Sequence, residues 1–162
     1  MREEDKAVTV ADLVDAVRAS RRHFWKHVDG LSGGQWDWKP YSECKSVRET
    51  LAHLVTDDRA ALAALHSGGE PDYEAFAEPE RDPDRLRALL AASHEALCAA
   101  ILTKFDGAPL DTPMSVWGAV KPLGIGIPFL CSEDYFHAGQ VSFIRLATDP
   151  GWDYYSAVYG EG

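Results

Sequence analysis

The decapeptide CSEDYFHAGQ, residues 131–140, places a carboxylate and an imidazole four positions apart, at Glu133 and His137. If the segment is helical, both side chains leave the same face of the helix. An unpartnered buried carboxylate or imidazole costs on the order of several kcal/mol, or it changes its protonation state. Three arrangements relieve that cost: a structural hydrogen-bonded pair, a pair of metal ligands, or the lining of a hydrated pocket. The face is the one such a helix should bury, since it also carries Leu130, Gln140, Val141 and Ile144.

A metal site needs at least one more ligand from another helix. The remaining histidines are His23, His27, His53, His66 and His94. His53 lies off the leucine stripe of its predicted helix, on a second face built largely from small residues. Such a face permits a lined site between helices, and it is equally compatible with plain exposure to solvent.

Two acids follow His53 on the same predicted helix. Asp58 falls in the middle of the leucine stripe, so we expect it to be buried in an ion pair with Arg145 or with an arginine of the first helix. Asp57 lies one turn after His53 and is a candidate outer ligand or hydrogen-bond acceptor, but its position favours a solvated surface acid.

Helical periodicity and capping signals predict four helices. The capping boxes start at Thr9 and Ser46, and Asp82-Pro83 is a further N-terminal signal. The expected helices span residues 10–29, 46–66, 83–105 and 128–148, the last of them opened by Pro128. Few strand signals are present, so the fold class is all-α, a four-helix bundle with long crossover connections, formed as one domain over residues 1–162.

Two segments outside these helices have unusual compositions. Residues 106–127 contain repeated Gly and Pro without helical period, and a connection of that length is usually functional or disordered. The tail, residues 149–162, is too aromatic to be left in water, and we expect it to pack on the bundle or on a second subunit.

Composition excludes several classes of function. Sixteen Lys and Arg against 26 Asp and Glu give a formal net charge of −10, which argues against binding to nucleic acid or to anionic membranes. The apolar stretches look too short to cross a bilayer. Three widely spaced cysteines imply no disulfide framework, and no signal peptide is evident, so we expect a soluble cytoplasmic protein.

Two stretches resemble the DinB/YfiT-like superfamily of bacterial four-helix bundles. The run LSGGQWDWKPYSECKSVRETLAHLVTDDRAAL is similar to its first half, and EDYFHAGQVSFIRLA to its last helix. The resemblance implies a divalent metal held by three histidines at one end of the bundle. His53 and His137 match two of those positions, whereas the third is Glu133 here. A set of two histidines and one carboxylate is a sound metal site, with zinc or nickel as first candidates and iron or manganese as alternatives.

By the same resemblance, the protein would be a metal-dependent transferase that joins a low-molecular-weight thiol to a small electrophilic substrate, or a related hydrolase. Gln140 would orient a metal-bound group, and the 106–127 segment, with Trp117 and Gly118, would form a pocket wall or lid. The resemblance also suggests a homodimer through the aromatic tail. The alternative of another class is a non-catalytic stress-response protein that binds a metal or a small molecule.

Overall fold

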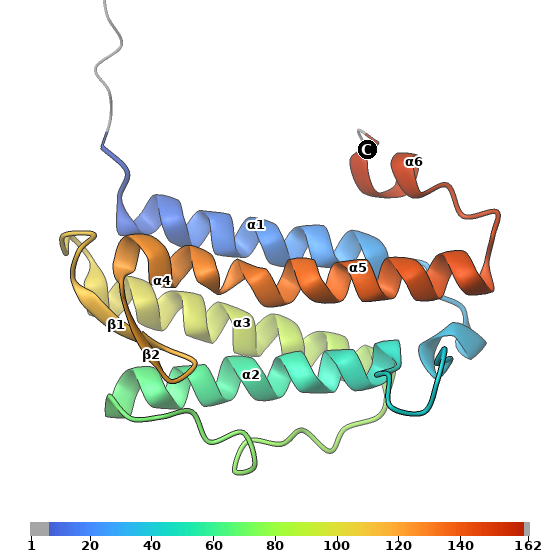
Figure 1. The fold of residues 1–162 in the computed structure, drawn as a ribbon, viewed down its shortest axis with the longest axis horizontal. Coiled ribbons are helices and arrows are strands. Elements are labelled where there is room, and N and C mark those ends of the chain that lie inside the picture. The colour runs from blue at the N-terminus through green and yellow to red at the C-terminus, as the bar shows by residue number, and fades with distance from the viewer. Residues whose placement is uncertain (1–6, 161–162) are drawn as a thin grey trace, which may run out of the picture.

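The computed structural model describes residues 7–160. Four long helices run along one axis, joined by short elements at their ends (Figure 1). The described elements are α1 (Val10–Val28), a 3-10 turn η1 (Gly33–Trp36), α2 (Val47–Ser67), α3 (Pro83–Phe105), β1 (Pro113–Val116), β2 (Ala119–Pro122), α4 (Leu123–Phe129), α5 (Cys131–Thr148) and α6 (Tyr154–Tyr159). The all-α fold class is confirmed, with one small two-stranded sheet added to it.

The first three long helices begin where their capping residues predict. The Thr9 hydroxyl accepts a hydrogen bond from the Asp12 backbone, and the Ser46 hydroxyl accepts one from Glu49, each completing a capping box. Asp82 caps α3 ahead of Pro83 in its first turn. These side chains satisfy backbone N–H groups that have no partner within the helix, and so they fix the helix starts.

The fourth predicted helix is divided, and Pro128 does not open it. α4 ends at Phe129, Leu130 breaks the run, and α5 starts at Cys131. Pro128 lies inside α4. Proline has no N–H to donate, and this costs little here because a seven-residue helix has few internal hydrogen bonds. Gly126 of α4 leaves room for the hairpin, since a Cβ there would lie 2.8 Å from the Met114 side chain.

The segment 106–127 was expected to be irregular, and instead it holds a β-hairpin. β1 and β2 pair antiparallel across a two-residue turn, Trp117-Gly118, in which both φ angles are positive, 45° and 79°. Such a turn matches the twist of the flanking strands. Each strand has four residues and a proline at its outer end, which is too short for a period of two to stand out in the sequence.

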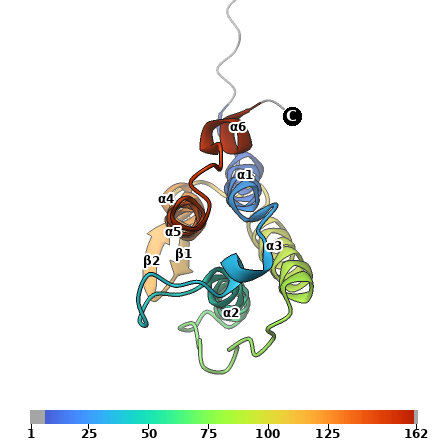
Figure 2. The ribbon, with the colours of Figure 1, turned by 90° about the vertical axis from the view of Figure 1, so that its right-hand side faces the viewer.

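The four long helices follow one another around the bundle axis in the order α1, α5, α2, α3 (Figure 2). α2 packs mainly on α3, and α1 mainly on α5, whereas α2 and α5 contact each other least of the neighbouring pairs. The hairpin contacts α2 through β1 and α4 through both strands. The side of the bundle between α2 and α5 is therefore the loosest.

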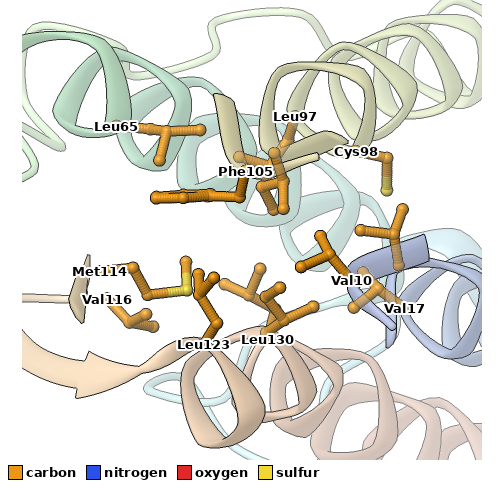
Figure 3. Packing of buried hydrophobic residues seen from close by; sticks show 13 residues of the cluster. Val10, Val17, Leu65, Leu97, Cys98, Phe105, Met114, Val116, Leu123 and Leu130 are labelled. Atoms are coloured by element: carbon orange, nitrogen blue, oxygen red, sulfur yellow. The ribbon is translucent and has the colours of Figure 1, made fainter. Parts of the chain in front are cut away.

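Buried apolar side chains form two clusters, one towards each end of the bundle. Figure 3 shows the cluster at the hairpin end, where α1, α3, α4 and the hairpin meet; it includes Val10, Val14, Val17, Leu97, Ile101, Phe105, Met114, Val116, Leu123 and Ile127. The other cluster includes Phe24, Val28, Leu51, Leu54, Val55, Leu86, Leu90, Val141 and Ile144. Both clusters draw on α1, α2 and α3, so apolar packing holds the bundle at two levels.

A buried polar layer lies between the two clusters. The guanidinium of Arg21 in α1 donates to both carboxylate oxygens of Asp58 in α2, at 3.1 and 3.3 Å, and through Nε to Asp134 in α5 at 2.6 Å. Ser20 donates to Asp134 and Ser93 of α3 donates to Asp58, at 2.7 and 2.9 Å. Each of the four long helices thus contributes to one hydrogen-bonded network.

Asp58 was expected to pair with Arg145 or with an arginine of the first helix, and the partner is Arg21 of α1. Burial by itself raises the pKa of Asp58, but Arg21 and His94 more than offset that effect and hold it below its ordinary value. Arg145 instead donates to the backbone carbonyls of His27 and Asp29 and lies 4.2 Å from the Trp152 ring centroid.

The aromatic tail packs on the bundle. α6 contacts α1, its Val158 is buried, and Lys26 donates to the Val158 carbonyl at 3.0 Å. Tyr155 and Tyr159 remain exposed.

The expectation that no apolar stretch could cross a bilayer is wrong for α3 on length and composition alone. One face of α3 packs against α1 and α2, and core helices of soluble proteins pass the same test, so the signal is weak evidence for a membrane.

We predict that Arg21→Met destabilises the protein by about 3–5 kcal/mol, because it leaves two buried carboxylates without their cation. The measurement is urea-induced unfolding followed by circular dichroism. Arg18→Met is the matched control one turn earlier in α1, where Arg18 pairs with the exposed carboxylates of Asp15 and Glu95; it should cost less than about 1 kcal/mol. Equal losses in the two variants would contradict the prediction.

Candidate metal centre

Three ligand-type side chains meet between α2 and α5. His53 extends from α2, and Glu133 and His137 extend from consecutive turns of α5. Nε2 of His137 lies 3.3 Å from Oε2 of Glu133, and Nε2 of His53 lies 3.6 Å from the same oxygen. One donor atom from each residue lies within 4.8 Å of the other two. The structure therefore brings together the three residues that the sequence predicted, part-way along the bundle rather than at one end of it.

The two ring nitrogens of His137 have different surroundings: Nδ1 contacts Gln140, and Nε2 faces Glu133. Its Nδ1 lies 2.7 Å from Oε1 of Gln140, and an amide oxygen only accepts, so Nδ1 carries the hydrogen. In the neutral ring Nε2 then offers a lone pair. This buried atom makes no hydrogen bond of regular geometry, and Oε2 of Glu133 lies 3.3 Å from it. A lone pair without a donor beside a carboxylate and a second imidazole is what a metal site requires.

The spacing of these atoms fits a metal ion. Metal–nitrogen and metal–oxygen bonds of about 2.0–2.2 Å place neighbouring ligands of a tetrahedral site about 3.3 Å apart. The separations of Glu133 from the two imidazoles, 3.3 and 3.6 Å, are close to that value. Three protein donors leave coordination positions free for other molecules.

The surroundings of Glu133 favour its ionised form, which is the form that binds a metal ion. The neighbouring imidazoles, His137 first and then His53, lower its pKa to about 2 despite partial burial. The lowering comes from hydrogen bonding between the imidazoles and the carboxylate, and then from their charge. Glu133 is thus a charged ligand over the whole physiological pH range.

Asp57 was expected to be a solvated surface acid, and this is wrong. Its side chain is 11% exposed, and Oδ2 lies 3.2 Å from Nε2 of His53. Burial raises the pKa of Asp57 to about 6, with the His53 imidazole acting in the opposite direction. The small residues around it, such as Ala60, are themselves buried, so the second face of α2 is an interior face.

An open cleft of about 410 Å³ reaches two of the three residues, His53 and Glu133, while His137 lies buried behind them. The lining of the cleft comes from α2, the 68–82 connection, the hairpin turn and α5: His53, Thr56, Asp57, Tyr73, Trp117 and Glu133. Trp117 therefore forms a wall of the pocket, as the sequence suggested for its segment. Residues 124–128, GIGIP, were also expected to help form the wall or lid. They belong to α4, where Ile127 is buried in the core, and they do not line the cleft.

Gln140 does not line the cleft, and its predicted role in orienting a metal-bound group stays a prediction. In the structure, the Gln140 side chain forms a hydrogen bond with Nδ1 of His137. It acts on the candidate centre through the orientation and tautomer of a ligand.

The other histidines have separate environments. His23 contacts the rings of Tyr135 and Tyr159, His27 is buried with its Nδ1 2.9 Å from the His23 carbonyl, and His66 is exposed. His94 is buried 3.9 Å from Asp58. Among residues 7–160, none of the four joins the group formed by His53, Glu133 and His137.

Sequence reasoning missed two residues that shape this region. Asp134 is almost fully buried and binds Arg21, and nothing in its sequence position distinguishes it from a surface acid. Tyr73 lines the cleft from a connection without periodicity, and nothing local in the sequence indicates this position.

A family model supports the resemblance over most of the chain. The model of the DinB superfamily matches residues 16–141, which include all three candidate ligands. The chain belongs to the DinB superfamily. No curated protein and no solved structure gives a significant match. Membership accounts for the helical fold, and the choice of metal and reaction must come from the site itself.

We predict that His137 is held in the Nδ1-protonated neutral tautomer and that Gln140→Leu releases it into a mixture of tautomers, because Leu cannot accept the hydrogen bond. Long-range nitrogen–proton NMR of the imidazole rings, above the pH at which they protonate, distinguishes the two forms. The exposed ring of His66 serves as the internal control and should be the same in both proteins. An Nε2-protonated His137 in the wild type would overturn the assignment.

Proposed function

We propose that this DinB-like protein binds a divalent metal ion through His53, Glu133 and His137 and uses it to transfer a small thiol to a small electrophilic substrate. The observation that carries the proposal is the buried Nε2 of His137, which makes no hydrogen bond of regular geometry and lies 3.3 Å from Oε2 of Glu133 within the group of three donors. Family membership supports a metal, and the donor set of two imidazoles and one carboxylate supports zinc or nickel first, with iron or manganese as alternatives.

The residues of the chain would divide the work as follows. His53, Glu133 and His137 hold the ion, and Gln140 fixes the ring of His137. A divalent ion bound there would acidify a thiol or water in an open position and so supply a nucleophile at neutral pH. Tyr73 and Trp117 present aromatic walls against which the organic part of a substrate can pack.

The size and openness of the cleft favour a small molecule. Ligand pockets commonly hold about 300–1,000 Å³, and the cleft of about 410 Å³ lies at the lower end of that range. Both the thiol and the electrophile would need to be compact. A hydrolase that uses water in place of the thiol would require the same protein residues.

One observation favours the non-catalytic alternative. None of the six residues that line the cleft is Lys or Arg, whereas a thiol carrying carboxylates would gain from a cationic partner. A metal- or small-molecule-binding protein without turnover would need no such partner.

We predict that the purified protein binds about one equivalent of divalent metal, and that His53→Ala and His137→Ala each lose it, because two donors rarely hold an ion tightly. Metal content after exposure to Zn²⁺, Ni²⁺, Fe²⁺ and Mn²⁺ separately is measured by elemental analysis. His66→Ala, an exposed histidine at the end of α2, is the matched control and should keep wild-type content. Negligible metal in all four proteins would remove the basis of the proposal.

Turnover has its own test. We expect the metal-loaded protein to consume glutathione-like thiols in the presence of small electrophiles, and to lose that activity in His137→Ala. Thiol loss is followed colorimetrically and the product by mass spectrometry. If metal raises the melting temperature but no thiol is consumed and no ester or amide substrate is hydrolysed, the protein is a binding protein.

A further inference from the structure

The carboxylate of Asp57 adjoins the candidate metal centre but does not belong to the three-residue group. It lies one turn after His53 on α2 and is buried, with 8% of the whole residue exposed. It lines the open cleft and also a second, small cavity of about 20 Å³, and Glu133 lines both as well. The acid therefore has space beside it on the side of the centre.

Its only ionic partner among the described side chains is Nε2 of His53, at 3.2 Å. The same nitrogen faces Glu133 at 3.6 Å and is the atom through which His53 would bind an ion. A ring nitrogen that coordinates a metal has no hydrogen to donate, so the two contacts are mutually exclusive. Binding of an ion would therefore remove the partner of a buried carboxylate.

A buried carboxylate left without a partner is costly, and the nearest replacement would be the ion that displaced it. The distance from Asp57 to His53, 3.2 Å, is close to the separation of about 3.3 Å between neighbouring ligands of a tetrahedral site. A rotation of the Asp57 side chain into the adjoining space would bring an oxygen towards the ion without moving the backbone of α2.

We propose that Asp57 is a fourth protein ligand of the metal centre, giving a donor set of two imidazole nitrogens and two carboxylate oxygens. The inference rests on the proposed function, in which His53, Glu133 and His137 bind an ion. The two carboxylates balance the charge of a divalent cation, whereas the three-residue set leaves one positive charge. Two oxygen donors also shift preference towards harder ions such as Mn²⁺ and Fe²⁺ relative to a set with one.

The test compares ion binding by the wild type and Asp57→Asn, which keeps the shape of the side chain and removes its charge. Isothermal titration with Zn²⁺ and with Mn²⁺ should show affinity at least about tenfold weaker in the variant. The visible absorption of bound Co²⁺ should also change, because it reports the donor set. Glu70→Gln is the matched control: Glu70 lies beside the hairpin turn at Gly118, and its loss removes one charge from the same region and should leave affinity within about twofold.

Whether Asp57→Asn weakens or strengthens ion binding distinguishes a metal ligand from a partner of His53 alone. If Asp57 merely pairs with His53 in the ion-free protein, its removal frees the imidazole, and binding becomes equal or tighter with an unchanged Co²⁺ spectrum. That result overturns the fourth ligand and leaves the three-residue site intact. A wild type that binds no ion defeats the proposed function instead. The ion-free variant should melt at or above the wild-type temperature, because a neutral amide replaces a buried carboxylate; should it fail to fold, Asp57→Ser is titrated in the same way.

Discussion

The candidate centre depends on the ion pairs that Arg21 makes with α2 and α5. Asp58 follows Asp57 directly in α2, and Asp134 follows Glu133 directly in α5. Successive residues of a helix point about 100° apart, so on both helices one acid is directed at Arg21 and its neighbour at the cleft. By binding both inner acids, the one guanidinium sets the separation of α2 and α5 at the level where the metal-ligand candidates face each other.

This constraint matters because apolar packing alone holds α2 and α5 only loosely. Each has its main partner elsewhere, α2 in α3 and α5 in α1. A gap between them admits a cleft, but donor atoms a few ångströms apart need a defined separation. Arg21 is suited to define it, since its planar fork binds one carboxylate through two nitrogens and another through the third. The apolar clusters on either side help to bury the layer, and the low polarity of their surroundings strengthens these contacts.

The sequence predicts the features that follow from helical periodicity. It misses the features that depend on which other element packs against a helix face. Periodicity and capping residues indicated the long helices, and the four-residue spacing placed Glu133 and His137 on one inner face. The small-residue face of α2 left His53 undecided, because burial of that face depends on α5 and the hairpin. Asp57 was misjudged for the same reason. The hairpin itself is too short for its pattern to be recognised, and its position over the cleft follows from packing on α2 and α4.

The polar groups of the site and of the layer act on stability in opposite directions. The pKa of Asp58 is lowered in the fold, so its contribution is present above the ordinary carboxyl pKa of about 4 and is lost as the pH falls through its lowered value. The pKa of Asp57 is raised to about 6, so the folded state binds more protons there than the unfolded state does, and stability falls as the pH rises from about 4 to 6. At neutral pH the ionised Asp57 therefore opposes folding, while Arg21 and its two acids hold the surrounding frame. A cation bound beside Asp57 would reverse that sign, so ion binding and folding would be coupled through the same carboxylate.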